Sequence, residues 1–342
     1  MGAESPEDSR KPTCVVVDTS VWRAEPLLKT PLGVTLVYTL SRRGGVVGLP
    51  EVVELELKGQ MVEAGLEAAD KARGPLHMLR TLTDDLFLAA ELPTRDKLSQ
   101  KVDERMAQLA RVLIREPFTV EHAKAALAMV NSKLPPNGEK NQQFKDSAIW
   151  QAVLALSLRY STVLLTNDKA FFRDKDPAKG LARNLVEDCI KAGTDVRAFY
   201  GIGPYLEALK GDEPEFDRER AKELIVPAVM PRLKLEAERY MSVPTDLLAA
   251  SISAFPTEKA DRLAIDYTLR FRVECVSPED REIAGIPNTG IVYGSGYFVP
   301  KENDLTDHYI QRIALIGRGG HSARDFKDYD DSFAIPRPLE WD

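Results

Sequence analysis

The chain has 342 residues, a length that suits two domains rather than one. Hydrophobic residues make up 44% of it and charged residues 29%, as in an ordinary soluble globular protein. The net charge of −7 argues against a protein that coats nucleic acid by bulk charge. It does not exclude a nuclease, because a metal ion can bridge an acidic site to a phosphate group.

The cysteines and the N-terminus exclude further classes of protein. Cys14, Cys189 and Cys275 are far apart and form no CxxC pair, which argues against a zinc ribbon or a disulfide framework. Residues 1–11 are polar and acidic, so we expect a disordered N-terminus rather than a signal peptide. No stretch approaches the roughly 18 apolar residues of a membrane span. We therefore expect a cytoplasmic protein with no membrane partner.

The first 210 residues alternate between short apolar runs and longer helical patterns. We expect strands at 14–17, 46–49, 162–166 and 196–200. We expect helices at 21–40, from Pro50 through Glu56, in further segments to about 130, at 144–160, at 181–192, and in a last turn before 210. A polar loop covers 131–143. Such alternation predicts a three-layer α/β domain over 12–210, a parallel sheet flanked by helices.

The pattern changes after a linker-like segment at 211–215. A charged helix is expected over 216–241. Residues 263–275 then alternate strictly between apolar and polar, which is typical of a half-buried antiparallel strand. Two more strands are expected at 291–300 and 309–316. Residues 211–342 therefore read as a smaller α+β domain with an antiparallel sheet. Its role stays open among substrate docking, partner binding, self-association and restraint of the first domain.

The chain has two glycine-rich segments, and segments of this kind sometimes bind phosphate groups. They are Gly294-Ser295-Gly296 and Gly317-Arg318-Gly319-Gly320. Neither stands between a strand and a helix, as a nucleotide-binding loop does. We interpret both as turns or bulges.

Four carboxylates are expected at one edge of the parallel sheet, where strands end and helices begin. Two of them, Asp18 and Asp168, follow predicted strands, whereas Asp146 lies at the start of a predicted helix and Glu56 lies in the second turn of another. The helix after Asp146 should run about 22 Å away from this edge of the sheet, and the next strand should run about 20 Å back toward it. Asp168 should therefore lie near the same edge as Asp146. Clustered oxygen ligands without His or Cys suit Mg²⁺ or Mn²⁺.

Each acid also has an ordinary structural interpretation. An Asp before Thr19 and Ser20 is a common helix cap, and an acid in a first helical turn is favoured by the helix dipole. Asp168 could belong to an ordinary turn. Glu54 and Glu51 are alternatives to Glu56 as the acid that this helix contributes to the site. The convergence of four acids on one edge favours a metal site nevertheless.

Lysines flank these acids, at Lys140, Lys145 and Lys169. We weigh a role in contacting substrate phosphates against simple solvation. Trp150, within the apolar helix that follows Asp146, is expected in the core.

Four segments in this order resemble the PIN domain nucleases. They are 15–20 (VVVDTS), 49–57 (LPEVVELEL), 144–150 (FKDSAIW) and 163–171 (VLLTNDKAF). The resemblance covers about residues 12–205. A long helical insertion between Glu56 and Asp146 and an additional C-terminal domain depart from the small toxins of this family.

The resemblance implies a metal-dependent endonuclease that hydrolyses phosphodiester bonds with Mg²⁺ or Mn²⁺. Asp18, Glu56, Asp146 and Asp168 would be the catalytic, metal-binding acids, and position after Pro50 favours Glu56 over Glu54. Ser20, Thr166 and Asn167 would support them. RNA is favoured as substrate over DNA, in RNA processing or in a toxin-like role with a protein inhibitor; homo-oligomerisation stays open. The alternatives are a non-catalytic RNA- or protein-binding module and a hydrolase of small phosphate esters.

Overall fold

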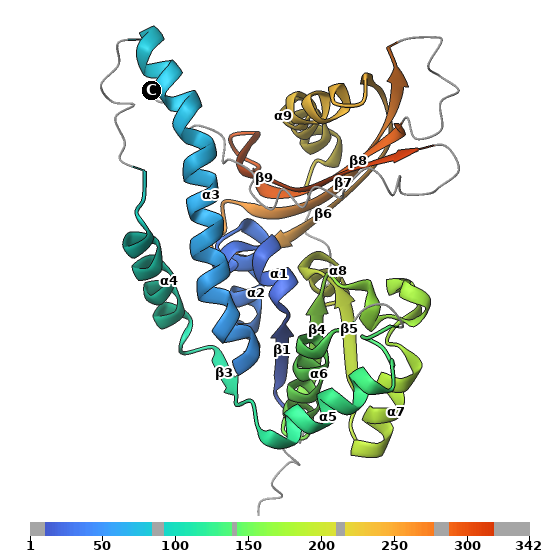
Figure 1. Ribbon diagram of the computed structural model, residues 1–342. Helices are drawn as coiled ribbons and strands as arrows, with labels where there is room; N and C mark the ends of the chain where they lie inside the picture. The colour runs from blue at the N-terminus through green and yellow to red at the C-terminus, as the bar shows by residue number, and fades with distance from the viewer. Residues whose placement is uncertain (1–10, 84–91, 139–141, 210–215, 277–286, 318–342) are drawn as a thin grey trace, which may run out of the picture. The chain divides into compact units, whose positions relative to one another are not determined.

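The computed structural model describes residues 11–83, 92–138, 142–209, 216–276 and 287–317. The predicted disordered N-terminus, apart from Lys11, and the linker 211–215 lie outside these ranges. The chain packs as two units, Met1–Leu27 with Val37–Tyr205 and Leu28–Leu36 with Leu206–Asp342 (Figure 1). The predicted assignment of 12–210 and 211–342 as domains stays a prediction.

The first unit is built on a five-stranded parallel sheet (Figure 1). Its strands are β1 (Thr13–Val17), β2 (Val46–Pro50), β3 (Leu113–Glu116), β4 (Ser161–Thr166) and β5 (Val196–Tyr200). They lie in the order β3-β2-β1-β4-β5. In chain order, β2 and β3 are therefore added on one side of β1, and β4 and β5 are then added on its other side. The point of reversal, between β1 and β4, is where open α/β sheets bind ligands.

Helices flank this sheet, as the α/β pattern predicts. The helices up to and just after β5 are α1 (Thr19–Ala24), α2 (Pro31–Arg42), α3 (Glu51–Thr83), α4 (Arg95–Leu109), α5 (Val120–Asn131), α6 (Phe144–Ser157), α7 (Arg183–Ala192) and α8 (Ile202–Leu209). The first residues of α2 and the last residues of α8 are grouped with the second unit, and α4 packs on α3. The apolar helix α6 packs against all five strands and between α5 and α7. Trp150 on α6 is fully buried, as predicted, because this helix lies over the centre of the sheet.

Two predictions in this unit are wrong. The helix expected over 21–40 is broken into α1, a 3₁₀ turn at Pro26–Leu28, and α2. Two prolines, Pro26 and Pro31, open new segments there, and Leu27 and Leu28 have positive φ angles that no helix accommodates. The short edge strand β3 was also missed. Its four residues, LIRE, carry too little apolar periodicity to reveal a strand.

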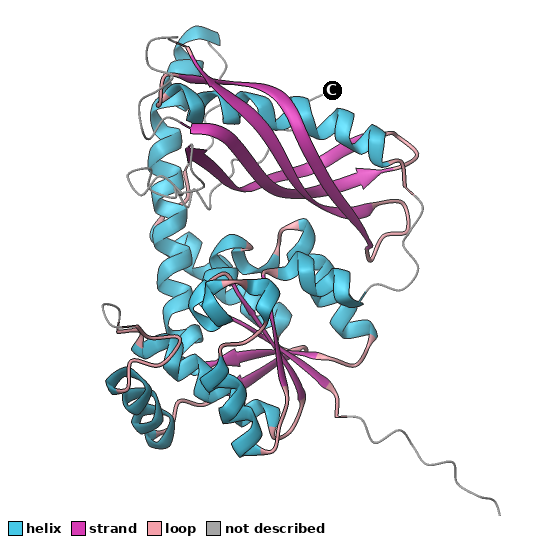
Figure 2. Ribbon diagram, turned by 90° about the vertical axis from the view of Figure 1, so that its right-hand side faces the viewer, coloured by secondary structure: helices cyan, strands magenta, loops and turns pink. Residues whose placement is uncertain are grey.

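The second unit contains a four-stranded antiparallel sheet with one long helix across a face (Figure 2). Its elements are α9 (Arg218–Glu238), β6 (Ser242–Pro256), β7 (Leu263–Cys275), β8 (Pro287–Val299) and β9 (Asp304–Gly317). The predicted alternation along β7 is confirmed. Ile265, Tyr267, Leu269 and Phe271 are buried in a core that α9 also forms. Strand β6 was not predicted, because Pro244 and local irregularities obscure its alternation.

The glycine-rich segment 294–296 lies within β8, where the pairing with β9 shifts register, so the predicted bulge is confirmed. A Cβ atom at Gly294 would lie 2.2 Å from the Tyr267 hydroxyl, so only glycine fits there. Gly317 ends β9, and residues 318–320 lie outside the described residues.

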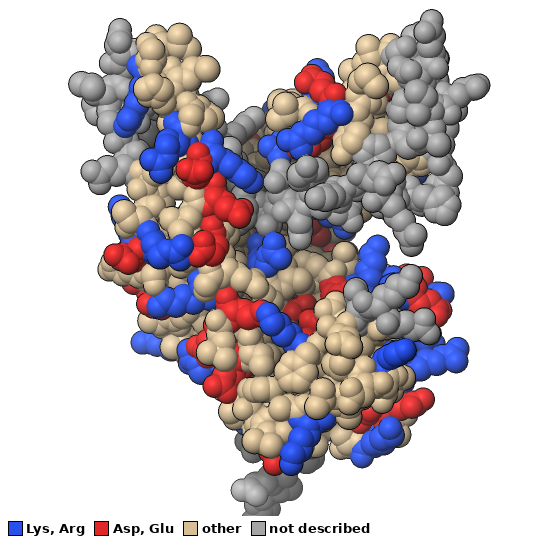
Figure 3. All heavy atoms as spheres, viewed as in Figure 1, with Lys and Arg blue, Asp and Glu red and all other residues tan. Residues whose placement is uncertain are grey.

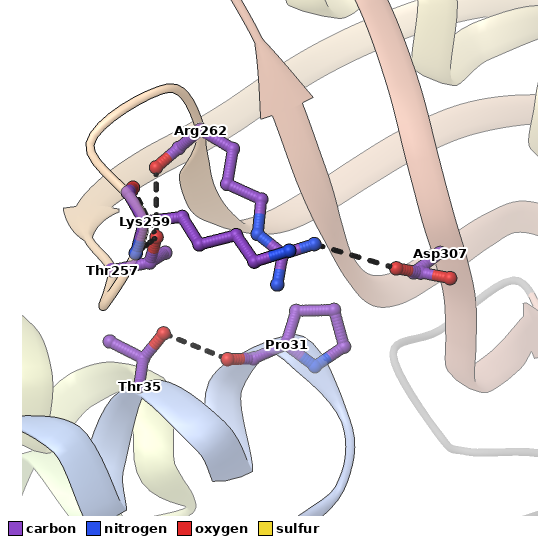
Figure 4. Close-up of polar contacts among 6 residues, drawn as sticks. All are labelled: Pro31, Thr35, Thr257, Lys259, Arg262 and Asp307. Carbon is purple, nitrogen blue, oxygen red and sulfur yellow. Dashed lines mark hydrogen bonds and ion pairs between the residues drawn. The ribbon is translucent and has the colours of Figure 1, made fainter.

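The turn between β6 and β7 is held by the Thr257 side chain (Figure 4). Its hydroxyl lies 2.8 Å from the carbonyl oxygen of Lys259 and 3.0 Å from that of Arg262. Asp307 on β9 lies 3.9 Å from the Arg262 guanidinium. The Thr257 contacts hold the turn itself, and the Arg262–Asp307 pair links it to β9, which is separated from β7 by β8.

Candidate active site

The acidic side chains predicted to form a site lie around the point of strand reversal. Asp18 follows β1 directly, and Asp168 follows β4 after one intervening residue. The two strands are neighbours, and the Asp18 main-chain N–H donates to the Leu165 carbonyl oxygen at 2.9 Å. The topology of the sheet thus brings the two acids from distant parts of the sequence to the same edge.

Asp18 is buried, with only 2% of its surface exposed. The hydroxyls of Ser20 and Thr166 both donate to its Oδ2 atom, each at 2.7 Å. The side chain makes no capping hydrogen bond to α1, although Asp18 occupies the N-cap position. Its carboxylate is therefore held by the site rather than used to begin the helix.

Burial raises the pKa of Asp18 above its ordinary value, and the nearby charge of Asp168 raises it further. Hydrogen bonds from Thr166, from Ser20 and from the Thr19 main chain act in the opposite direction. A buried carboxylate whose ionised form is opposed by its surroundings gains from a nearby cation.

The segment after β4 is fastened to α1. The Asn167 main-chain N–H donates to the Ser20 hydroxyl at 3.0 Å, and the Asn167 side-chain amide donates to the Ser20 carbonyl oxygen at 3.3 Å. Thr166 accepts a hydrogen bond from the Asp168 N–H at 3.0 Å. Asp168 Oδ1 accepts from the Ala170 N–H at 2.8 Å, so the structural interpretation of Asp168 as a turn residue also holds.

The three glutamates at the start of α3 have different partners. Glu51 accepts a hydrogen bond from the Phe118 main-chain N–H, and Glu54 pairs with the Arg115 guanidinium at 2.9 and 3.0 Å. Glu56 instead pairs with the Lys145 ammonium, and the Thr19 hydroxyl lies 3.5 Å from its Oε2 atom. Of the three, Glu56 is the one whose contacts lie among the residues around Asp18 and Asp146.

Asp146 lies in the first turn of α6, and a buried asparagine fixes the loop that leads to it. The Asn137 amide donates to the Ser147 hydroxyl at 2.8 Å and to the Leu134 carbonyl oxygen at 3.1 Å. Its own oxygen accepts from the Gln143 N–H at 2.6 Å. Asn137 therefore ties both ends of the predicted polar loop to the start of α6.

The four acids influence one another electrostatically. Burial raises the pKa of Asp146 to about 7, and the charges of Asp18, Asp168 and Glu56 each add to that rise, whereas Lys145 lowers it. Four carboxylates from four separate segments thus repel within one region of the molecule. Such an arrangement is stabilised when a cation enters it.

The donor chemistry fits a hard divalent cation, because all four groups offer carboxylate oxygens. The four carboxylates are, however, farther apart than the ligands of a metal site that encloses its ion. Within the described ranges, no three acidic, histidine or cysteine side chains gather closely enough to enclose one ion. The side chains would have to close in around a bound cation, and the Lys145–Glu56 ion pair stands in their way.

Two residues at this site were not predicted from the sequence, namely Thr19 and Asn137. Thr19 follows Asp18 directly, and its position in the first turn of α1 was the available signal. The contacts of Asn137 depend on the folding of the loop and left no signal beyond its polar composition. Of the flanking lysines, Lys145 pairs with Glu56, Lys169 is exposed, and Lys140 lies outside the described residues.

The three cysteines, which were not expected to form a disulfide framework, are free and buried. Among the described helices, none has the combination of length and apolar character that crossing a membrane demands.

Comparison with known proteins gives one family. The model of the PIN domain matches residues 15–171, from β1 through the 3₁₀ turn after β4, and includes all four acids. No curated protein and no solved structure matches the chain. The matched order of elements and the parallel sheet agree with the resemblance seen in the sequence. Residues 15–171 therefore belong to the PIN domain family, whose members are generally nucleases.

Proposed function

We propose that the first unit hydrolyses phosphodiester bonds in RNA, with Mg²⁺ or Mn²⁺ held by Asp18, Glu56, Asp146 and Asp168. The observation that carries the proposal is the placement of Asp18 and Asp168 at the ends of the neighbouring strands β1 and β4, with the hydroxyls of Ser20 and Thr166 holding the buried Asp18 carboxylate. PIN domains typically use divalent metals and act on nucleic acids, which supports the proposal.

The supporting residues have roles in orienting the acids. Thr166 and Ser20 hold Oδ2 of the Asp18 carboxylate, and Asn167 fastens the segment that carries Asp168. A divalent cation would supply activation of water and stabilisation of the charge on the phosphate. The reaction adds water across a P–O bond, so the chain itself need not form a covalent intermediate. The expected setting is the cytoplasm.

The proposal is tested by incubating the full-length protein with end-labelled single-stranded RNA, with Mn²⁺, Mg²⁺ or EDTA. We expect cleavage only with a divalent cation, and a loss of at least about 100-fold with Asp146→Asn. If Asp146→Asn cleaves as fast as the parent, the assignment of the site is wrong. Binding of RNA without cation-dependent turnover would instead identify a binding module.

The choice of glutamate has a matched control on the same helix. Glu56→Gln should abolish most of the activity, because the Glu56 carboxylate is one of the proposed ligands and its contacts are Lys145, next to Asp146, and the Thr19 hydroxyl, next to Asp18. Glu54→Gln removes an equal charge two residues away, yet its partner is Arg115 on β3. We expect Glu54→Gln to retain most of the activity. If Glu54→Gln lost most of the activity and Glu56→Gln retained it, Glu54 rather than Glu56 would be the acid of the site. Parallel reactions with single-stranded DNA of the same sequence would show whether RNA is preferred.

A further inference from the structure

Lys145 occupies an unusual position for a surface lysine. It precedes Asp146 in the first turn of α6, and its ammonium pairs with Oε1 of Glu56 on α3. The Lys145 side chain is 67% exposed, whereas the Glu56 side chain is only 21% exposed. The carboxylate is therefore the more buried partner of the pair, and the ammonium is the one more open to solvent.

The Lys145 charge acts on more than its direct partner. It lowers the pKa of Asp146, which burial raises most and the three other carboxylates raise further. Lys145 thus supplies part of the positive charge that this group of acids lacks. Lys169 follows Asp168 directly in the sequence and is exposed.

An ammonium and a divalent cation compete for one carboxylate, because they repel each other and both need the same oxygen atoms. In the structure, Oε1 of Glu56 is occupied by the Lys145 ammonium. Coordination of a cation through that oxygen would therefore require Glu56 to exchange its partner. The released ammonium would then stand beside the cation, exposed, where a phosphate group of a substrate binds.

We propose that Lys145 is an internal counter-ion, which competes with the divalent cation for Glu56 and is released to the substrate phosphate when the cation binds. This inference rests on the proposed function of the site. It makes cation binding and nucleic-acid binding mutually reinforcing, because each removes Lys145 from Glu56. By linkage, the cation should strengthen RNA binding by the same factor as RNA strengthens cation binding.

The first experiment measures Mn²⁺ binding to the full-length protein by calorimetry without nucleic acid, so it does not depend on turnover. Lys145→Met should lower the dissociation constant about two- to fivefold, the range expected from an exposed ion pair. Lys145→Arg keeps the charge and should bind like the parent. Lys169→Met is the matched control for loss of a nearby positive charge and should change the constant less than Lys145→Met.

The Glu56→Gln background makes the test specific to the pair. In that background the effect of Lys145→Met should fall to less than about 1.5-fold, because its partner is already absent. An equal effect with and without Glu56 would overturn the proposal, since it would show general charge repulsion. Tightening no greater than that of Lys169→Met would overturn it too.

The second experiment tests the release step. Fluorescence anisotropy of a labelled single-stranded RNA is measured with Ca²⁺ or with EDTA, and gels verify that the RNA stays intact. The gain in RNA affinity on adding Ca²⁺ should be about two- to fivefold smaller in Lys145→Met than in the parent. An equal gain in both proteins would overturn the coupling. If the parent binds Mn²⁺ and cleaves RNA while these tests fail, the proposed function stands and only the role of Lys145 is wrong.

Discussion

At the scale of single residues, the site depends on groups that hold the carboxylates in place. Thr166 is the clearest example, because its hydroxyl donates to Asp18 and accepts from the N–H of Asp168. One buried side chain thereby links the acid after β1 with the acid after β4. Groups of this kind usually affect metal affinity nearly as much as the ligands themselves.

Thr166→Val keeps the shape of the side chain and removes this hydroxyl. We expect Mn²⁺ affinity to fall about 10- to 100-fold, as is typical for loss of a group that orients metal ligands. The loss should appear in a calorimetric titration and in cleavage at limiting Mn²⁺. Thr162→Val, on the same strand but away from the acids, is the control. Equal losses in both variants would mean that the effect arises from the strand rather than from the hydroxyl.

Asp146→Asn should change the pH dependence of stability in the metal-free protein. The folded Asp146 has a pKa of about 7 and the ordinary value is 3.8, so the folded state binds the proton more tightly. The Asp146 contribution to the free energy of unfolding is therefore complete at low pH and declines as the pH rises to about 7. An asparagine does not titrate, so Asp146→Asn does not lose this contribution to the free energy of unfolding as the pH rises.

Urea unfolding in EDTA at pH 5 and pH 8 measures this difference. We expect Asp146→Asn to be more stable than the parent by about 1 kcal/mol at pH 8, after allowance for partial exposure, with a smaller difference at pH 5. A parent protein that is the more stable of the two at pH 8 would contradict the raised pKa. Saturating Mn²⁺ should reverse the order, since a bound cation stabilises the folded parent.

The place of an acid along the chain's strands and helices was predictable from the sequence where it depends on one element. Asp18, Asp146 and Asp168 lie at the strand ends and the helix start where we expected them. The choice between Glu54 and Glu56 could not be derived from the pattern of the helix alone, because it depends on Arg115, which lies on the strand that was missed. The pairing of Lys145 with Glu56 likewise requires two helices to meet, which no local pattern reveals.

At the scale of elements, strand order decides which residues meet. The reversal between β1 and β4 joins segments about 150 positions apart in the chain, as the register of Val17 with Leu165 shows. The strands that carry this arrangement were predictable because each is a compact apolar run. Strand β6 was not, because long irregular strands lack a strict period of two. Breaks such as the one at Pro26–Leu28 depend on backbone angles that composition does not specify.

The loop before α6 offers a prediction at this scale. Asn137→Ala removes three hydrogen bonds that hold the loop to the start of the helix. The Ser147 hydroxyl and the Gln143 N–H lose a partner, so we expect a loss of about 1–3 kcal/mol in the free energy of unfolding. Cleavage should also slow, because the start of α6 carries Asp146. Asn131→Ala, on the exposed end of α5, is the control. An unchanged urea midpoint in Asn137→Ala would contradict this role.

At the scale of the whole molecule, charge limits how nucleic acid can bind. The net charge is −7, and on the face shown in Figure 3 the basic side chains are interspersed with acidic ones. The protein therefore lacks the bulk positive charge of a non-specific coat, as the composition predicted. Under the proposed function, attraction for a phosphate therefore comes from a few local groups, namely the bound cation and Lys145.

The salt dependence of RNA binding follows from this distribution of charge. Each phosphate contact with single-stranded RNA contributes about 0.7 to the slope of log affinity against log salt. With about two to four such contacts, we expect a slope between about −1.5 and −3. The measurement is the KM for a short labelled RNA at KCl concentrations between about 50 and 200 mM, at a fixed saturating concentration of Mn²⁺. Lys145→Met should make the slope shallower by up to about 0.7, because one contact is lost. A slope steeper than about −5 would contradict local recognition and indicate an extended basic surface.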